Sequence, residues 1–149
     1  MDRDPHFVAL EKMYAAGPIN ELFQPVLEVG EGMASIDMEV SERFFHAGGA
    51  LHGSVYFKML DDAAFFAANS LEREVFVLTA SFSTRFRRPV TGGRLRAVGR
   101  VTEAGGSRYR ADSELFDESG APVAEGSGVF ARSRIALVDA MGYADPGSR

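Results

Sequence analysis

Two adjacent carboxylates, Asp61 and Asp62, stand inside a long apolar stretch of the sequence. The run from Gly53 to Ala68 has the usual length of one helix and leaves no clean polar face. A helix that is apolar almost all round is normally buried, and a carboxylate within it is costly unless it is hydrogen-bonded or paired. Such a group is a candidate for general-base or nucleophilic chemistry. The residues alone do not decide which of the two carboxylates would do this chemistry.

The loop before this helix carries the next candidates, His46, His52 and Gly53. Gly53 is expected to begin the helix, so its N–H is an unpaired donor at the positive end of the helix dipole. Such a donor can hold an oxyanion, and the missing side chain lets a substrate approach closely. Alternatively, Gly53 only makes the turn into the helix. We expect His52 to be structural and to tie the loop by hydrogen bonds.

The composition is that of one ordinary globular domain, with 46% apolar and 25% charged residues. A net charge of −5 argues against a nucleic-acid binder driven by bulk charge. Cysteine is absent, which excludes disulfides and suits a reducing cytoplasm, and the three scattered histidines show no metal-ligand spacing. No secretory signal or membrane span is visible, so we expect a cytoplasmic protein without a metal.

The other elements are expected to surround the central helix. They are a helix over Asp4–Ala16, a hairpin turning at Gly30–Gly32 into a strand over Ala34–Val40, and strands Phe76–Phe86, Leu95–Val101, Arg108–Phe116 and Val123–Arg132. Successive hairpins predict an antiparallel sheet, and one long helix can cover its dry face. The predicted class is α+β, with one domain over residues 1–134. The polar tail, residues 135–149, is expected to be partly disordered.

Several motifs together resemble the PaaI-like hotdog acyl-CoA thioesterases. The residues similar to the H-G-G-x-x-x-x-L-A-D-x-A signature of that family are His52-Gly53, Asp61 eight residues later, Ala63 and Asn69-Ser70. The stretch T-A-S-F-S-T-R-F-R-R-P-V-T-G-G is similar to the family's strand after the helix, and the resemblance covers about Glu28 to Arg132. It implies a hotdog fold, in which a curved antiparallel sheet wraps around one helix. It also implies hydrolysis of an acyl-CoA thioester to a carboxylic acid and coenzyme A.

The same resemblance implies roles for individual residues. Asp61 is expected to be the nucleophile or the general base for water, and the Gly53 N–H the oxyanion donor. Asp62 lies about 100° further round the helix and should reach solvent or a basic group. His46 is a departure, because the family commonly has asparagine there. Its imidazole can replace the amide as a donor, the pocket can be altered, or His46 is only a loop residue.

Thr79 matches the position where the family often has a serine or threonine near the acid. Strict alternation along the strand places Thr79 on the face opposite Phe82 and Phe86, so its access to the site depends on a bend or a second subunit.

Four basic residues, Lys58, Arg85, Arg87 and Arg88, could clamp the phosphates of coenzyme A, which is expected as part of the substrate and not as a cofactor. A solvated outer sheet face explains the three arginines equally well.

Gly53 and Asp61 are separated by roughly 12 Å along one helix, too far for both to contact one reacting carbon. A two-fold axis between antiparallel helices would bring Gly53 of one chain to Asp61 of another. The resemblance implies the same homodimer, often paired again into a tetramer. The same fold hosts hydratases and dehydratases, but their H-F-P loop is absent. The remaining alternative is a non-catalytic module that binds or senses acyl-CoA.

Overall fold

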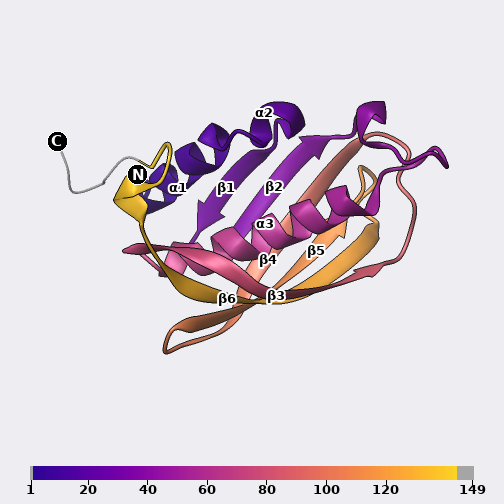
Figure 1. Ribbon diagram of the computed structural model, residues 1–149. Coiled ribbons are helices and arrows are strands. Elements are labelled where there is room, and N and C mark those ends of the chain that lie inside the picture. The colour runs from indigo at the N-terminus through magenta and orange to yellow at the C-terminus, as the bar shows by residue number, and fades with distance from the viewer. Residues whose placement is uncertain (1, 144–149) are drawn as a thin grey trace.

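The computed structural model describes residues 2–143 and shows a curved six-stranded antiparallel sheet around one long helix (Figure 1). In spatial order, the strands are β1 (Val26–Gly30), β2 (Met33–Glu39), β4 (Arg94–Gly105), β5 (Arg108–Phe116), β6 (Pro122–Ala136) and β3 (Val75–Phe86). The helices are α1 (Pro5–Ala16), α2 (Asn20–Phe23), the central α3 (Gly53–Leu71) and two short 3₁₀ turns, η1 (Glu42–Phe44) and η2 (Leu137–Asp139). The predicted α+β hotdog fold is confirmed.

The middle of α3 packs directly on the sheet. Leu60, Ala63 and Ala67 are fully buried, as the apolar sequence of the helix predicted. Gly99 of β4 lies under the helix, where a Cβ atom would collide with the carbonyl group of Ala63. Small residues on both sides therefore let the helix backbone approach the strand closely. This contact fixes the height of α3, and hence of its two carboxylates, above the sheet.

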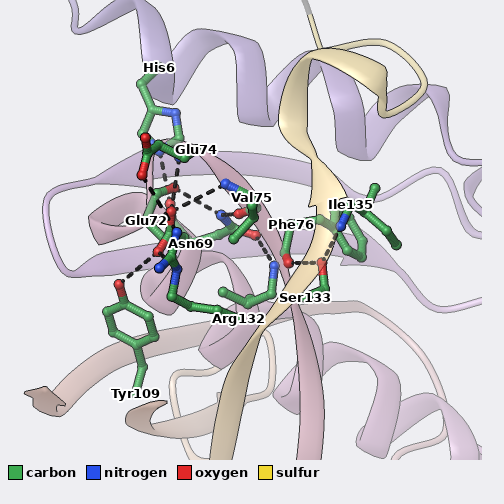
Figure 2. A network of polar contacts seen from close by, with 11 residues as sticks. His6, Asn69, Glu72, Glu74, Val75, Phe76, Tyr109, Arg132, Ser133 and Ile135 are labelled. Carbon is green, nitrogen blue, oxygen red and sulfur yellow. Dashed lines mark hydrogen bonds and ion pairs between the residues drawn. The ribbon is translucent and has the colours of Figure 1, made fainter. Parts of the chain in front are cut away.

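The C-terminal end of α3 is held by a polar network (Figure 2). The side chain of Asn69 accepts from the Val77 N–H at 3.0 Å and donates to the carbonyl oxygen of Val75 at 3.1 Å. Glu72 accepts from the Val75 N–H and forms an ion pair with Arg132 of β6 at 2.7 Å. The prediction that the helix ends at Ala68 is wrong, because Asn69 remains helical while its side chain bonds the turn that follows.

A β-bulge in β3 changes which side chains face α3. Thr79 pairs with Phe130 of β6 and Ser81 pairs with Val129, so Ala80 is an extra residue between them. As a result, Thr79 and Phe82 lie on the same face of the strand. Thr79 bonds to α3, and the ring of Phe82 contacts Phe57 of α3 with centroids 5.4 Å apart. The strict alternation predicted for this strand is therefore wrong.

Residues 135–143 pack against the domain more closely than the sequence predicted. Strand β6 continues to Ala136, and Leu137 and Tyr143 expose only 1% and 7% of their surfaces. The boundary predicted after residue 134 and the fraying tail are therefore wrong for residues 135–143, because these side chains are buried. Residues 144–149 lie outside the described part. Helix α2 was also missed, since four residues give too short a period to detect.

Candidate active site

Asp61 lies in the middle of α3 at the edge of a pocket of about 740 Å³. Its Oδ1 accepts a hydrogen bond of 2.9 Å from the hydroxyl of Thr79, so the bulge in β3 brings together the two residues predicted to act near each other. Burial raises the pKa of Asp61 to about 6. The hydrogen bond from Thr79 lowers this pKa, and the negative charge of Asp62 raises it further. A carboxylate with this pKa can accept a proton near neutral pH.

Asp62 is engaged on the neighbouring face of α3. Its Oδ2 accepts from the Tyr14 hydroxyl at 2.6 Å and from the Lys58 ammonium at 2.7 Å. Lys58 also lies 5.3 Å from the centre of the Tyr14 ring. Burial and Asp62 together raise the pKa of Tyr14 well above its ordinary value, so Tyr14 is a neutral donor. The prediction that Asp62 reaches a basic group is confirmed.

The walls of the Asp61 pocket are mostly apolar. They include Phe65 and Phe66 of α3, Phe76 and Leu78 of β3, and residues from α1, from the α1–α2 connection and from the end of the chain, such as Met13, Pro18 and Met141. Sequence reasoning found Asp61 and Thr79 but missed these distant walls. Only tertiary packing brings them to α3, and a helical apolar pattern in α1 does not reveal its partner.

A second, smaller pocket of about 320 Å³ lies at the N-terminal end of α3. Gly53, His46, Tyr56 and Phe86 line it, together with Arg87 and Arg88. The prediction that His52 is structural is confirmed: its Nδ1 accepts from the Ser54 N–H at 3.0 Å and caps the helix.

The Gly53 N–H is an unpaired donor in the first turn of α3. The carbonyl oxygen of His52 accepts from the Val55 N–H at 3.0 Å, and the His52 ring accepts from Ser54. Within residues 2–143, no acceptor bonds the N–H of Gly53. This N–H lies at the positive end of the helix dipole and beside a pocket, as an oxyanion donor must.

His46 lies across the same pocket with its imidazole in a defined orientation. Its Nδ1 accepts from the Gly48 N–H at 3.0 Å, and its backbone bonds Ala50 and Gly49. A nitrogen that accepts an N–H carries no proton, so the neutral ring carries its proton on Nε2. His46 therefore has one N–H to donate, whereas the amide of an asparagine at this position would have two.

The four basic residues predicted as a phosphate clamp do not meet in one place. Lys58 lies in the Asp61 pocket, paired with Asp62, whereas Arg87 and Arg88 line the Gly53 pocket. Arg87 also forms an ion pair with Glu125. Arg85 lines a groove with Asp112, Ser127 and other polar residues away from both pockets. Lys58 belongs to α3, Arg85 belongs to β3, and Arg87 and Arg88 follow the end of β3, so these side chains do not form a single cluster.

Two negative findings apply to residues 2–143. No group of three His, Asp or Glu side chains lies close enough together to hold a metal ion. None of the helices in this range is both long and apolar enough to cross a membrane.

The chain belongs to the Thioesterase superfamily, whose family model matches residues 48–124, more than half of the chain. The matched residues include Gly53, Asp61 and Thr79, and they include the parts of α3 that line the two pockets. No curated protein matches the sequence.

Solved structures share the fold. The PaaI protein of E. coli, from the phenylacetic acid degradation operon, is 22% identical over 89% of this chain and 99% of its own, with a TM-score of 0.79. A thioesterase family protein from Silicibacter pomeroyi is 23% identical over 83% of this chain and 96% of its own, with a TM-score of 0.76. AziG of S. sahachiroi is 26% identical over 80% and 99%, with a TM-score of 0.74. The first two likenesses concern the fold alone.

Proposed function

We propose that the protein hydrolyses acyl-CoA thioesters to a carboxylic acid and coenzyme A. The observation that carries this proposal is the state of Asp61 in a member of the Thioesterase superfamily. Its carboxylate lies at an apolar pocket, bonds only to a neutral hydroxyl among residues 2–143, and has a pKa of about 6 because it is buried. The pocket is apolar, and Asp61 is its carboxylate without an ion pair. Such a pocket suits an acyl group whose carbonyl carbon is to be attacked.

Asp61 has two possible routes. As a general base, it takes a proton from water, and the hydroxide adds to the thioester carbon. As a nucleophile, its oxygen adds directly and forms an anhydride, which water then cleaves. In both routes the carbonyl oxygen becomes negative, and the C–S bond breaks with the electron pair leaving on the sulfur of coenzyme A. The Gly53 N–H and the His46 Nε2–H would hold that oxygen.

The proposed site combines two chains. Gly53 and Asp61 line different pockets of one protomer and are separated by eight residues of helix, roughly 12 Å. A reacting carbon must lie about 3 Å from both the attacking atom and the oxyanion donors. A homodimer with antiparallel α3 helices would place Gly53 of one chain beside Asp61 of its partner, and Arg87 and Arg88 would then flank the coenzyme.

Release of coenzyme A from a panel of acyl-CoA esters, followed with a thiol-reactive dye, tests the activity. Wild type should release thiol and Asp61→Asn should not. If wild type releases none but binds acyl-CoA thioethers in calorimetry, the protein is a non-catalytic acyl-CoA-binding module and the proposed hydrolysis is wrong.

Mixing two inactive variants tests the shared site. Asp61→Asn and Gly53→Pro, which removes the N–H at the first helical position, are refolded together so that mixed dimers form. A mixed dimer holds one intact and one doubly defective site if the site is shared, and random mixing restores about a quarter of wild-type activity. If mixed dimers are confirmed by mass but remain inactive, Gly53 and Asp61 act within one chain.

A further inference from the structure

The end of the described chain forms one wall of the Asp61 pocket. We call residues 137–143 the C-terminal segment; Figure 1 shows this segment, in yellow, beside α1. Ala140 and Met141 of the segment line the pocket, and Met141 exposes 61% of its surface. Ile135, just before the segment, and Phe76 of β3 line the same region. This wall was not predicted from the sequence, because the tail is polar and contains glycine.

The C-terminal segment is docked specifically. Gly142 has a φ of +82°, and a Cβ there would lie 2.5 Å from the Cβ of Ala16 and 2.8 Å from the carbonyl oxygen of Lys12 on α1. A side chain at this position is therefore excluded by both the backbone conformation and the neighbouring helix. Leu137 and Tyr143, at the two ends of the segment, are buried.

His6 connects the segment to the end of α3. Its Nδ1 lies 2.9 Å from the Tyr143 hydroxyl. Its Nε2 lies 2.8 Å from the carbonyl oxygen of Asn69, and Figure 2 shows His6 beside Asn69. The carbonyl can only accept, so Nε2–H donates to Asn69 and Nδ1 accepts from Tyr143. The segment is thus anchored beside Asn69, about two helical turns beyond Asp61 toward the C-terminal end of α3.

The pocket is polar at Asp61 and apolar toward the segment. Its three charged residues all lie on α3, where Lys58 and Asp62 neutralise each other. One turn beyond Asp61 comes Phe65, whose ring packs on Phe76 with centroids 5.1 Å apart. A chain attached to a carbonyl at Asp61 and directed along α3 would therefore have the apolar side chains of Phe65, Phe76 and Ile135 beside it as it approached Met141.

We propose that Met141, held in place by the docked C-terminal segment, sets the length of the acyl chain that the pocket accepts, and that the substrate is an apolar acyl group. This inference rests on the proposed function. Methionine suits such a wall because its flexible side chain fills gaps of different shape. Each methylene that finds an apolar surface changes binding about fourfold, so a wall that stops the chain produces a sharp limit in chain length.

The test compares chain-length profiles from hexanoyl- to tetradecanoyl-CoA for three variants. Met141→Trp fills the end of the pocket and should lower kcat/KM for the longest relative to the shortest ester on the order of tenfold. Met141→Ala should shift the preference toward longer esters. The matched control is Val138→Ala, an exposed residue of the same segment that does not line the pocket, and its profile should equal that of wild type.

Calorimetry with S-hexyl- and S-dodecyl-CoA thioethers separates this proposal from the activity. If hydrolysis occurs and neither Met141 variant changes the profile, Met141 does not set the chain length, and the proposed function stands. If no ester is hydrolysed but the Met141 variants change the thioether affinities in the expected directions, Met141 does limit the chain length and the proposed hydrolysis is wrong. A fourth variant, Gly142→Val, should undock the segment and flatten the profile. A sharp profile in a folded Gly142→Val protein would overturn the role of the docked segment.

Discussion

Asp61 and Asp62 are identical side chains on consecutive residues, yet their surroundings differ in kind. Asp62 is satisfied by a cation and a phenol, at 2.7 and 2.6 Å. Asp61 receives one neutral hydroxyl at 2.9 Å and is otherwise next to apolar walls. A single helical rotation of about 100° is therefore enough to hold one carboxylate in an ion pair and to leave its neighbour at the pocket without one.

The largest expected effect is on activity. Asp61→Asn should lower kcat about 10²–10⁴-fold, because an amide can neither accept the proton nor attack. Asp62→Asn should keep kcat within a few-fold of wild type, since Tyr14 can still donate to the amide oxygen. Steady-state hydrolysis of one acyl-CoA ester measures both. Equal losses in the two variants would mean that the two carboxylates act as one unit.

A similar contrast between two histidines exists near the N-terminal end of α3. His52 is committed to capping the helix, whereas the Nε2 of His46 has no hydrogen-bond partner among residues 2–143. His46→Ala should lower kcat about 10²–10³-fold, the effect typical for loss of one oxyanion donor. His46→Asn should recover a good part of this loss. Unchanged kinetics in the alanine variant would return His46 to a loop residue.

The free energy of unfolding should change in opposite directions when Asp61 and Asp62 are replaced by asparagine. Burial raises the pKa of Asp61 to about 6, from 3.8, so ionisation favours the unfolded chain and stability falls as the pH rises from about 4 to about 6. Asp61→Asn removes this cost and should stabilise the protein at pH 8 by at most about 3 kcal/mol, with little effect at pH 4. Asp62→Asn loses its ion pair and should destabilise by about 0.5–1 kcal/mol.

Urea unfolding at the two pH values measures these changes, with each variant serving as the control for the other. A decrease in the unfolding free energy of Asp61→Asn at pH 8 would show that this carboxylate contributes to structure. The burial of Asp61 would then not lower the stability of the protein in exchange for activity.

The sequence was sufficient for the parts of the site that are local in the chain. The apolar run, the glycine at its start and the two acids fall on one helix, so helical geometry alone orders them. Thr79 was placed on the wrong face because a β-bulge adds a residue that alternation cannot show. Met141 and Tyr14 reach the pocket from opposite ends of the chain, and only the packed fold determines such contacts.

The smallest expected effect concerns the pH dependence of the reaction. Asp61 must be ionised to act, so kcat should rise with pH through about 6. The negative charge of Asp62 contributes to the raised pKa of Asp61, after burial, while Lys58 opposes it.

Asp62→Asn removes the like charge and leaves Lys58 in place, which favours the ionised form of Asp61. The acidic limb of the kcat profile should therefore move to lower pH, by less than about one unit because burial remains the larger cause. A profile recorded from pH 4 to 9 for wild type and Asp62→Asn measures the shift, and Glu103→Gln, an exposed residue that pairs with Arg110 and lines neither pocket, should leave it unchanged. Movement of the limb to higher pH would mean that Asp62 helps ionise Asp61, and the division of roles between the two carboxylates would be wrong.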